Sequence, residues 1–104
     1  MARLEDVARY VRSKTAGPFW VTIDVFCDDD ASFSRVVRAP GLTPAAVARL
    51  YGVSADSVKL FPDPTLRVLK VSFPRPVIQG SAADADSHAG QYFVRLLDAL
   101  VAPD

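Results

Sequence analysis

The stretch Phe19–Cys27 (FWVTIDVFC) decides the fold of this chain. Every second residue from its first to its last position is apolar, whereas the positions between them, Trp20, Thr22, Asp24 and Phe26, are mixed. Apolar residues at every second position are typical of a β-strand that buries one of its faces. We therefore expect a strand covered by helices on one side. The two large aromatic residues on the other side indicate that this side is partly covered as well.

On the N-terminal side of this strand, residues 3–13 predict an amphipathic surface helix. Its apolar residues recur with the spacing of one helical face, at Leu4, Val7, Ala8 and Val11. We expect this helix to end before Gly17-Pro18, because glycine and proline both interrupt helices. Residues 12–17 would then form a polar loop that leads into the strand.

Two helices are predicted on the C-terminal side of the strand. Asp28-Asp29-Asp30 can cap a helix over residues 31–38, and Thr43 followed by Pro44 begins a second helix that Gly52 ends. The side chains expected to face inward are Phe33, Val36 and Val37 in the first helix and Val47, Leu50 and Tyr51 in the second.

A hairpin and a last helix complete the predicted order. Residues 58–61 and 66–73 are apolar or alternating, and Pro62-Asp63-Pro64 between them predicts a turn. A polar loop of small residues over 77–87 then leads to a helix over about 88–101. Because the strands are few and clustered, the predicted class is α+β, with a small antiparallel sheet, helices packed on one face and a broadly ferredoxin-like arrangement.

Length and composition limit the classes of protein that this chain can be. A chain of 104 residues is enough for one compact domain and too short for two, so we expect a single domain over residues 1–104. Its 12 basic and 12 acidic residues give a net charge of zero, which argues against binding to nucleic acid or an anionic membrane through bulk charge. The single cysteine, Cys27, excludes a disulfide framework and suits the reducing cytoplasm. No apolar run approaches the ~20 residues of a membrane-spanning helix.

Three conspicuous residue types favour structural explanations. The run Asp28–Asp30 lacks the spacing of a cation-binding loop and is better explained as a helix cap in a solvated turn. Cys27 lies on the apolar side of the predicted strand, where a small buried hydrophobe is expected. His88, the one histidine, lies near Asp84 and Asp86, but no candidate nucleophile accompanies it. We predict no metal site and no cofactor, and we assign no catalytic residue.

Two polar loops are the better candidates for a site. Residues 12–17 offer two cations, two hydroxyls and a glycine, which suits a carboxylate or phosphate but equally suits an ordinary helix C-terminus. Residues 75–91 form a long polar segment, and long loops without regular structure are often functional. The candidate substrate-binding residues are Arg12, Ser13, Lys14, Gly17, Asp24, Arg75, Asp84, Asp86, His88 and Gln91.

Residues 47–58 also resemble the middle of a helix-turn-helix, with Gly52 as the turn residue. The second helix of such a motif would offer only Ser57 and Lys59 to DNA before Pro62 ends it. DNA binding is therefore the least favoured interpretation.

Several motifs together resemble the family called domain of unknown function 4387, over nearly the whole chain. They are the segment Arg12–Phe19 with Thr22 and Asp24, then Leu42-Thr43 and Leu50–Val53, and finally Arg75-Pro76, Gly80-Ser81, Asp84, Asp86 and Gln91. The resemblance implies a small companion of a larger acyclic terpene utilisation (AtuA-like) protein, acting in the catabolism of organic acids or their thioesters. It implies no catalytic residues, and the matched positions are motif positions only.

The leading hypothesis is a small cytoplasmic accessory subunit that docks on an AtuA-like protein and lends its polar loops to a shared site. It would then be part of an enzyme complex rather than catalytic alone. Trp20 and Phe26, on the mixed face of the strand, are candidate interface anchors. The alternative is a stand-alone homo-oligomeric domain that uses Arg12, Lys14 and Arg75 to hold a small anionic metabolite.

Overall fold

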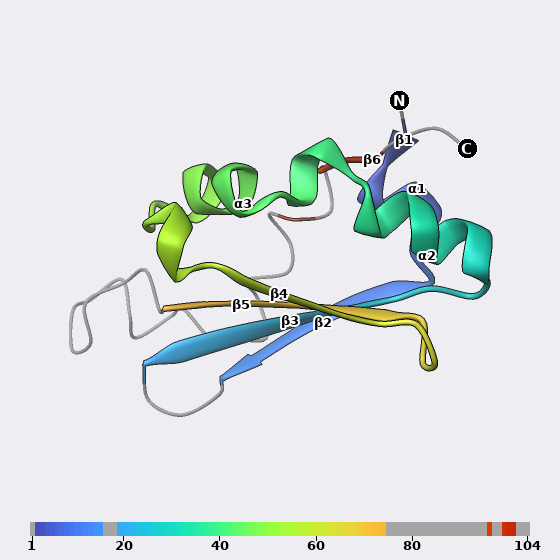
Figure 1. The fold of residues 1–104 in the computed structure, drawn as a ribbon, viewed down its shortest axis with the longest axis horizontal. Coiled ribbons are helices and arrows are strands. Elements are labelled where there is room, and N and C mark those ends of the chain that lie inside the picture. The colour runs from blue at the N-terminus through green and yellow to red at the C-terminus, as the bar shows by residue number, and fades with distance from the viewer. Residues whose placement is uncertain (1, 16–18, 75–95, 97–98, 102–104) are drawn as a thin grey trace.

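The computed structural model of the chain has a four-stranded antiparallel sheet with helices on one of its faces (Figure 1). The structure describes residues 2–15, 19–74, 96 and 99–101. In chain order its elements are β1 (Ala2–Arg3), α1 (Leu4–Val7), β2 (Tyr10–Thr15), β3 (Trp20–Phe26), α2 (Asp30–Val37), α3 (Pro44–Tyr51), β4 (Lys59–Asp63), β5 (Val68–Pro74) and β6 (Leu100–Val101). Short 3-10 turns at Pro40–Leu42 and Ala55–Ser57 flank α3. The predicted α+β class, with helices on one face of an antiparallel sheet, is confirmed.

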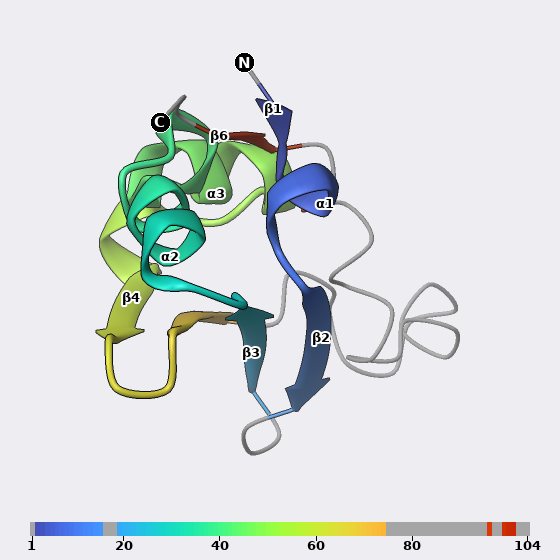
Figure 2. The ribbon, with the colours of Figure 1, turned by 90° about the vertical axis from the view of Figure 1, so that its right-hand side faces the viewer.

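The strand order of the main sheet is β2-β3-β5-β4. The helices α2 and α3 connect β3 to β4, and β5 returns between these two strands and pairs antiparallel with both. This is a split β-α-β arrangement, which ferredoxin-like sheets also contain. The fourth strand, β2, comes from the N-terminal side and lies at the other edge, against β3. A separate pair, β1 with β6, brings the two ends of the chain side by side (Figure 2).

The period of two predicted for β3 is observed. Val21, Ile23 and Val25 are buried on the side that faces the helices. Their register partners Phe73, Val71 and Leu69 in β5 are buried with them. One part of the prediction is wrong, because Phe19 precedes the strand and is 66% exposed.

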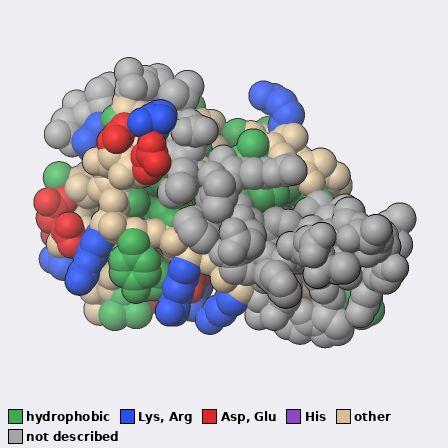
Figure 3. Space-filling model, turned by 180° about the vertical axis from the view of Figure 1, so that it is seen from behind, with side chains coloured by type: hydrophobic (Ala, Val, Ile, Leu, Met, Phe, Trp, Pro, Cys, Tyr) green, Lys and Arg blue, Asp and Glu red, His purple; other side chains and the backbone are tan. Residues whose placement is uncertain are grey.

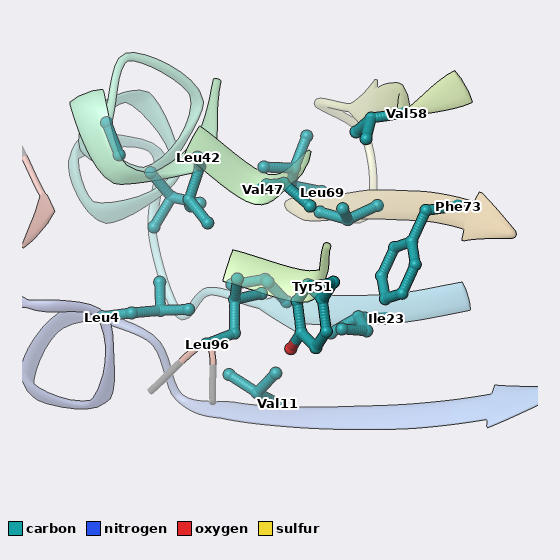
Figure 4. Packing of buried hydrophobic residues seen from close by; sticks show 14 of the residues in the cluster. Leu4, Val11, Ile23, Leu42, Val47, Tyr51, Val58, Leu69, Phe73 and Leu96 are labelled. Atoms are coloured by element: carbon teal, nitrogen blue, oxygen red, sulfur yellow. The ribbon is translucent and has the colours of Figure 1, made fainter. Parts of the chain in front are cut away.

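The core fills the space between the sheet and the helices (Figure 4). Tyr51 of α3 stacks on Phe73 of β5, with ring centroids 4.4 Å apart. Leu4, Leu42 and Leu96 extend this cluster along the helical layer, and all three are almost completely buried. Residues from both halves of the chain therefore share one core.

The helix caps follow the sequence closely. The Asp29 carboxylate accepts the Ser32 N–H at 2.8 Å and begins α2, and Thr43 Oγ1 accepts the Ala46 N–H at 3.2 Å and begins α3. Gly52 ends α3 with φ of 71°, a left-handed conformation that glycine adopts without strain. Both predicted helices are confirmed, although Val37 and Leu50, expected to face inward, are 43% and 37% exposed.

The helix predicted over residues 3–13 is wrong in its second half. The helix α1 ends at Val7, and residues 10–15 form the strand β2. Val11 fits both patterns, because it lies seven residues after Leu4 and also alternates with Tyr10 and Arg12. Pairing along the whole of β2 with β3, which buries Val11, decides in favour of the strand.

The last predicted helix is also corrected where the structure describes it. Residues 100–101 form β6 and pair with residues 2–3, so the chain there is extended. Leu96 is buried, as its place on the predicted apolar stripe requires. The rest of the predicted helix over 88–101, and the predicted loop over 77–87, lie outside the described residues.

Phe73→Ala should cost about 3–5 kcal/mol of unfolding free energy, because it removes a fully buried ring and its stack with Tyr51. Phe61→Ala is the matched control. Phe61 is 55% exposed, so its loss should change the stability by about 0.5 kcal/mol or less. Urea unfolding monitored by circular dichroism measures both. Equal losses in the two variants would contradict the layer arrangement.

Candidate functional site

The helices that the structure describes lie on one face of the main sheet, and we call the opposite face the outer face. Residues opposite one another in the strand registers share a face, so the side chains on it follow from the pairing. They are Tyr10, Arg12, Lys14, Trp20, Thr22, Asp24, Phe26, Lys59, Phe61, Asp63, Val68, Lys70, Ser72 and Pro74. Hydrophobic and basic side chains lie next to one another along the lower side of the view from behind, where the sheet lies (Figure 3).

A row of four residues crosses the middle of the outer face. Arg12 in β2 lies opposite Asp24 in β3, Asp24 lies opposite Lys70 in β5, and Lys70 lies opposite Phe61 in β4. Directly opposite residues on neighbouring strands have Cβ atoms only about 5 Å apart. The Asp24 carboxylate therefore has a cation on each side.

The Asp24 carboxylate is the unusual group of this face. Its side chain is only 4% exposed, although it is not on the core side of the strand. One oxygen, Oδ2, lies 3.6 Å from Arg12 Nε, a loose ion pair. The other, Oδ1, is buried and has no hydrogen-bond partner among the described residues. A buried acceptor without a donor is costly and calls for an explanation.

Arg12 is positioned by an aromatic pair as well as by Asp24. Its guanidinium carbon lies 5.2 Å from the centroid of the Phe26 ring, a cation–π contact. Tyr10 stacks on Phe26, with centroids 4.5 Å apart and ring planes 15° apart. The Arg12 side chain nevertheless remains 57% exposed, so it can reach a ligand.

The outer face is basic, although the chain as a whole is neutral. It carries four basic residues, Arg12, Lys14, Lys59 and Lys70, and only two acidic ones, Asp24 and Asp63. Within the part of the chain that the structure describes, neither Lys14 nor Lys70 forms an ion pair. Two half-buried hydroxyl residues, Thr22 and Ser72, lie between Lys14 and Lys59 in the neighbouring row. An anion is the ligand that this charge distribution favours.

The predicted site residues are only partly brought together. Arg12, Lys14 and Asp24 share the outer face, but Arg12 and Lys14 belong to β2 and not to the predicted loop. Ser13 alternates with them and is 8% exposed on the core side, so it lies apart from the other three. The other predicted site residues, Gly17, Arg75, Asp84, Asp86, His88 and Gln91, lie outside the described residues.

Sequence reasoning missed Lys70, Ser72 and Lys59 as neighbours of Asp24. The alternation over residues 66–73 does place Lys70 and Ser72 on one side of a strand. The alternation does not show which strand lies beside Lys70 and Ser72. The strand order, with β5 against β3, brings Lys70 opposite Asp24.

The run Asp28–Asp30 has a structural role, as predicted. Asp29 caps α2, and the Ser32 backbone N–H and hydroxyl hydrogen-bond its carboxylate and so lower its pKa. Asp30 lies 2.9 Å from Arg67 Nε, and Asp28 lies 3.7 Å from Arg9 Nε. Among the described residues there is no group of three or more side chains that could hold a metal ion.

The helix-turn-helix resemblance has no second helix in the structure. After α3 the chain makes the short 3-10 turn Ala55–Ser57 and then enters β4 at Lys59. Ser57 and Lys59, which would contact DNA in such a motif, therefore lie in this turn and in the edge strand β4.

Comparison with known proteins identifies the family. The family model described as "Domain of unknown function (DUF4387)" matches residues 4–100, so the chain belongs to that family. None of the curated proteins and none of the solved structures matches it. Within the described residues, no helix has the length and apolar character needed to cross a membrane.

Asp24→Asn should stabilise the free protein by about 1 kcal/mol, because it removes a buried charge that has only one loose partner. The corresponding rise in melting temperature is roughly 4–8 °C for a domain of this size. Calorimetry of both proteins at pH 7 measures it. A clear loss of stability would instead mean that Oδ1 has a strong donor within the chain.

Cys27 should be chemically inert in the native protein. Burial, with Asp29 and Asp28 nearby, raises the pKa of its thiol to about 11. At pH 8 the thiolate fraction is then at least about a hundredfold below that of an ordinary cysteine. We expect Ellman's reagent to react correspondingly slowly with the native chain and fully once urea has unfolded it. Rapid reaction without denaturant would contradict the burial of this residue.

Proposed function

We propose that the chain is a small accessory subunit that docks through the outer face of its sheet onto a larger AtuA-like protein. The AtuA-like partner comes from the family resemblance, and the surface comes from the fold. In this proposal the polar centre of the outer face completes a site that the two proteins share, in the catabolism of organic acids or their thioesters. A cytoplasmic location suits the single free thiol of Cys27.

One observation carries the docking proposal: large aromatic side chains are exposed around a polar centre. Tyr10 is 48% exposed, Trp20 37% and Phe61 55%, and all three lie on the outer face. They are spread around the polar centre, with Tyr10 and Trp20 towards opposite ends of β3, and tryptophan and tyrosine are common anchors of interfaces. Phe26, the other anchor expected from the sequence, is half-buried and engaged by Tyr10 and Arg12. In this proposal Phe26 supports the anchor Tyr10 by stacking on it and is not itself an anchor.

The charge of the outer face favours a different protein as the partner over a second copy of the chain. Two copies packed through this face would bring Arg12, Lys14, Lys59 and Lys70 of each against those of the other. Like charges placed close together disfavour association. An acidic surface on a larger protein would complement them.

The second candidate is a stand-alone domain that binds a small anionic metabolite, as a homo-oligomer. The exposed cations Arg12, Lys14 and Lys70 favour it. They all lie on this one chain, so an anion could bind to them in the absence of a partner protein. In that case the isolated chain binds its ligand fully, and the exposed aromatic residues pack between copies.

The docking proposal predicts that the chain co-purifies with an AtuA-like protein from the same genome when the two are expressed together. Trp20→Ala and Phe61→Ala should each weaken this association at least about tenfold, as loss of an interface anchor does. Leu66→Ala is the matched control, since Leu66 is 67% exposed in the turn that follows β4. Isothermal titration calorimetry measures the affinities. A chain that never associates, or three variants that weaken binding equally, would contradict the proposal.

A further inference from the structure

The surroundings of Asp24 define the chemistry of a ligand more narrowly than the charge of the outer face alone. A carboxylate that is ionised accepts hydrogen bonds and cannot donate them. Its Oδ1 atom is buried without a hydrogen-bond partner among the described residues, while Arg12 and Lys70 stand on either side of it. A bound group that satisfies Oδ1 must therefore carry a proton donor.

We propose that the outer face binds a small hydroxycarboxylic acid, with the ligand's hydroxyl donating to Asp24 Oδ1 and its carboxylate held by Arg12 and Lys70. The assignment deepens the proposed function, since this would be the ligand of the shared site. It names the class of substrate for that site, and it stands on the geometry around Asp24.

The carboxylate of the ligand follows from the cations. Arg12 offers a planar guanidinium that can bind a carboxylate through two hydrogen bonds. Lys70 is exposed, and it forms no ion pair within the described part of the chain. Lys14, with Thr22 and Ser72 in the next row, adds a further cation and two hydroxyls for a second polar group of the ligand.

The hydroxyl of the ligand follows from Asp24 by elimination. A bare dicarboxylate such as succinate would meet the buried negative charge of Asp24 and has no hydrogen to donate to Oδ1. An ammonium group could donate to Oδ1, but it would lie among Arg12, Lys14 and Lys70 and be repelled by them. A neutral hydroxyl donates without either penalty.

A ligand that reaches Asp24 would displace the side chains beside it. Its two register neighbours, Arg12 and Lys70, are long and exposed, and Arg12 is held to Asp24 by one ion pair of 3.6 Å. Side-chain rearrangement of this kind is common when a surface binds its partner. An incoming carboxylate can therefore draw Arg12 away from Oδ2 while the hydroxyl approaches Oδ1.

Malate and succinate test the proposal, because they differ by one hydroxyl. The chain has a single tryptophan, Trp20, on the same face as Asp24, so its fluorescence reports binding directly. We expect the full chain, alone and in complex with its AtuA-like partner, to bind malate at least about tenfold more tightly than succinate. Asp24→Ala, which leaves no side-chain acceptor at this position, should remove this preference, and Arg12→Gln should weaken the binding of both anions. Asp56→Ala, which removes an exposed carboxylate elsewhere, is the matched control and should change nothing.

The outcomes separate the two proposals. If the partner co-purifies but malate and succinate bind equally, or malate does not bind in the complex, the ligand assignment is wrong and the accessory function stands. If malate binds the isolated chain selectively and no partner associates, the ligand assignment stands and the accessory function falls. A malate preference that survives in Asp24→Ala would also overturn the assignment, because another group would then provide the selectivity.

Discussion

The register of β3 between β2 and β5 is the constraint on which the rest of this structure depends. Val21, Ile23 and Val25 enter the core together with the buried residues of β5 that lie opposite them. A slip of one residue would turn these three outward and would bury Trp20 and Thr22. The same register sets Asp24 between Arg12 and Lys70. One strand register therefore positions both the core residues and the residues of the candidate site.

Local patterns predict most of the described fold. The caps at Asp29 and Thr43, the end of α3 at Gly52 and the alternation of β3 are all determined by neighbouring residues, and they are observed. The segment around Val11 is different, since its apolar residues satisfy a helical and an extended pattern equally well. Only its pairing with β3 decides between them, and pairing is a long-range interaction. For the same reason the strand at Leu100–Val101 depends on Ala2–Arg3, almost a whole chain length away.

The candidate site was predictable in its residue types and not in its arrangement. Arg12, Lys14 and Asp24 stand out in the sequence as polar residues beside an apolar strand. Their arrangement on a sheet face, with Ser13 turned to the core, follows from β2 being a strand and not a loop. The neutral composition hides the basic surface as well, because several aspartates serve as caps and ion-pair partners near α2, away from the outer face. The net charge of a chain therefore says little about the charge of any one face.

The pairing of β1 with β6 has a consequence for how this domain can be joined to other proteins. The two strands lie in the helical layer, and the main sheet lies on the opposite side of the molecule (Figure 1). Strands β1 and β6 therefore lie on the helical side of the sheet and away from the outer face. The adjacent ends also make circular permutation feasible, since a short linker can join them and new ends can be opened in the turn between β4 and β5. The domain is therefore suited to insertion into, or fusion with, a larger chain while its sheet stays available for binding.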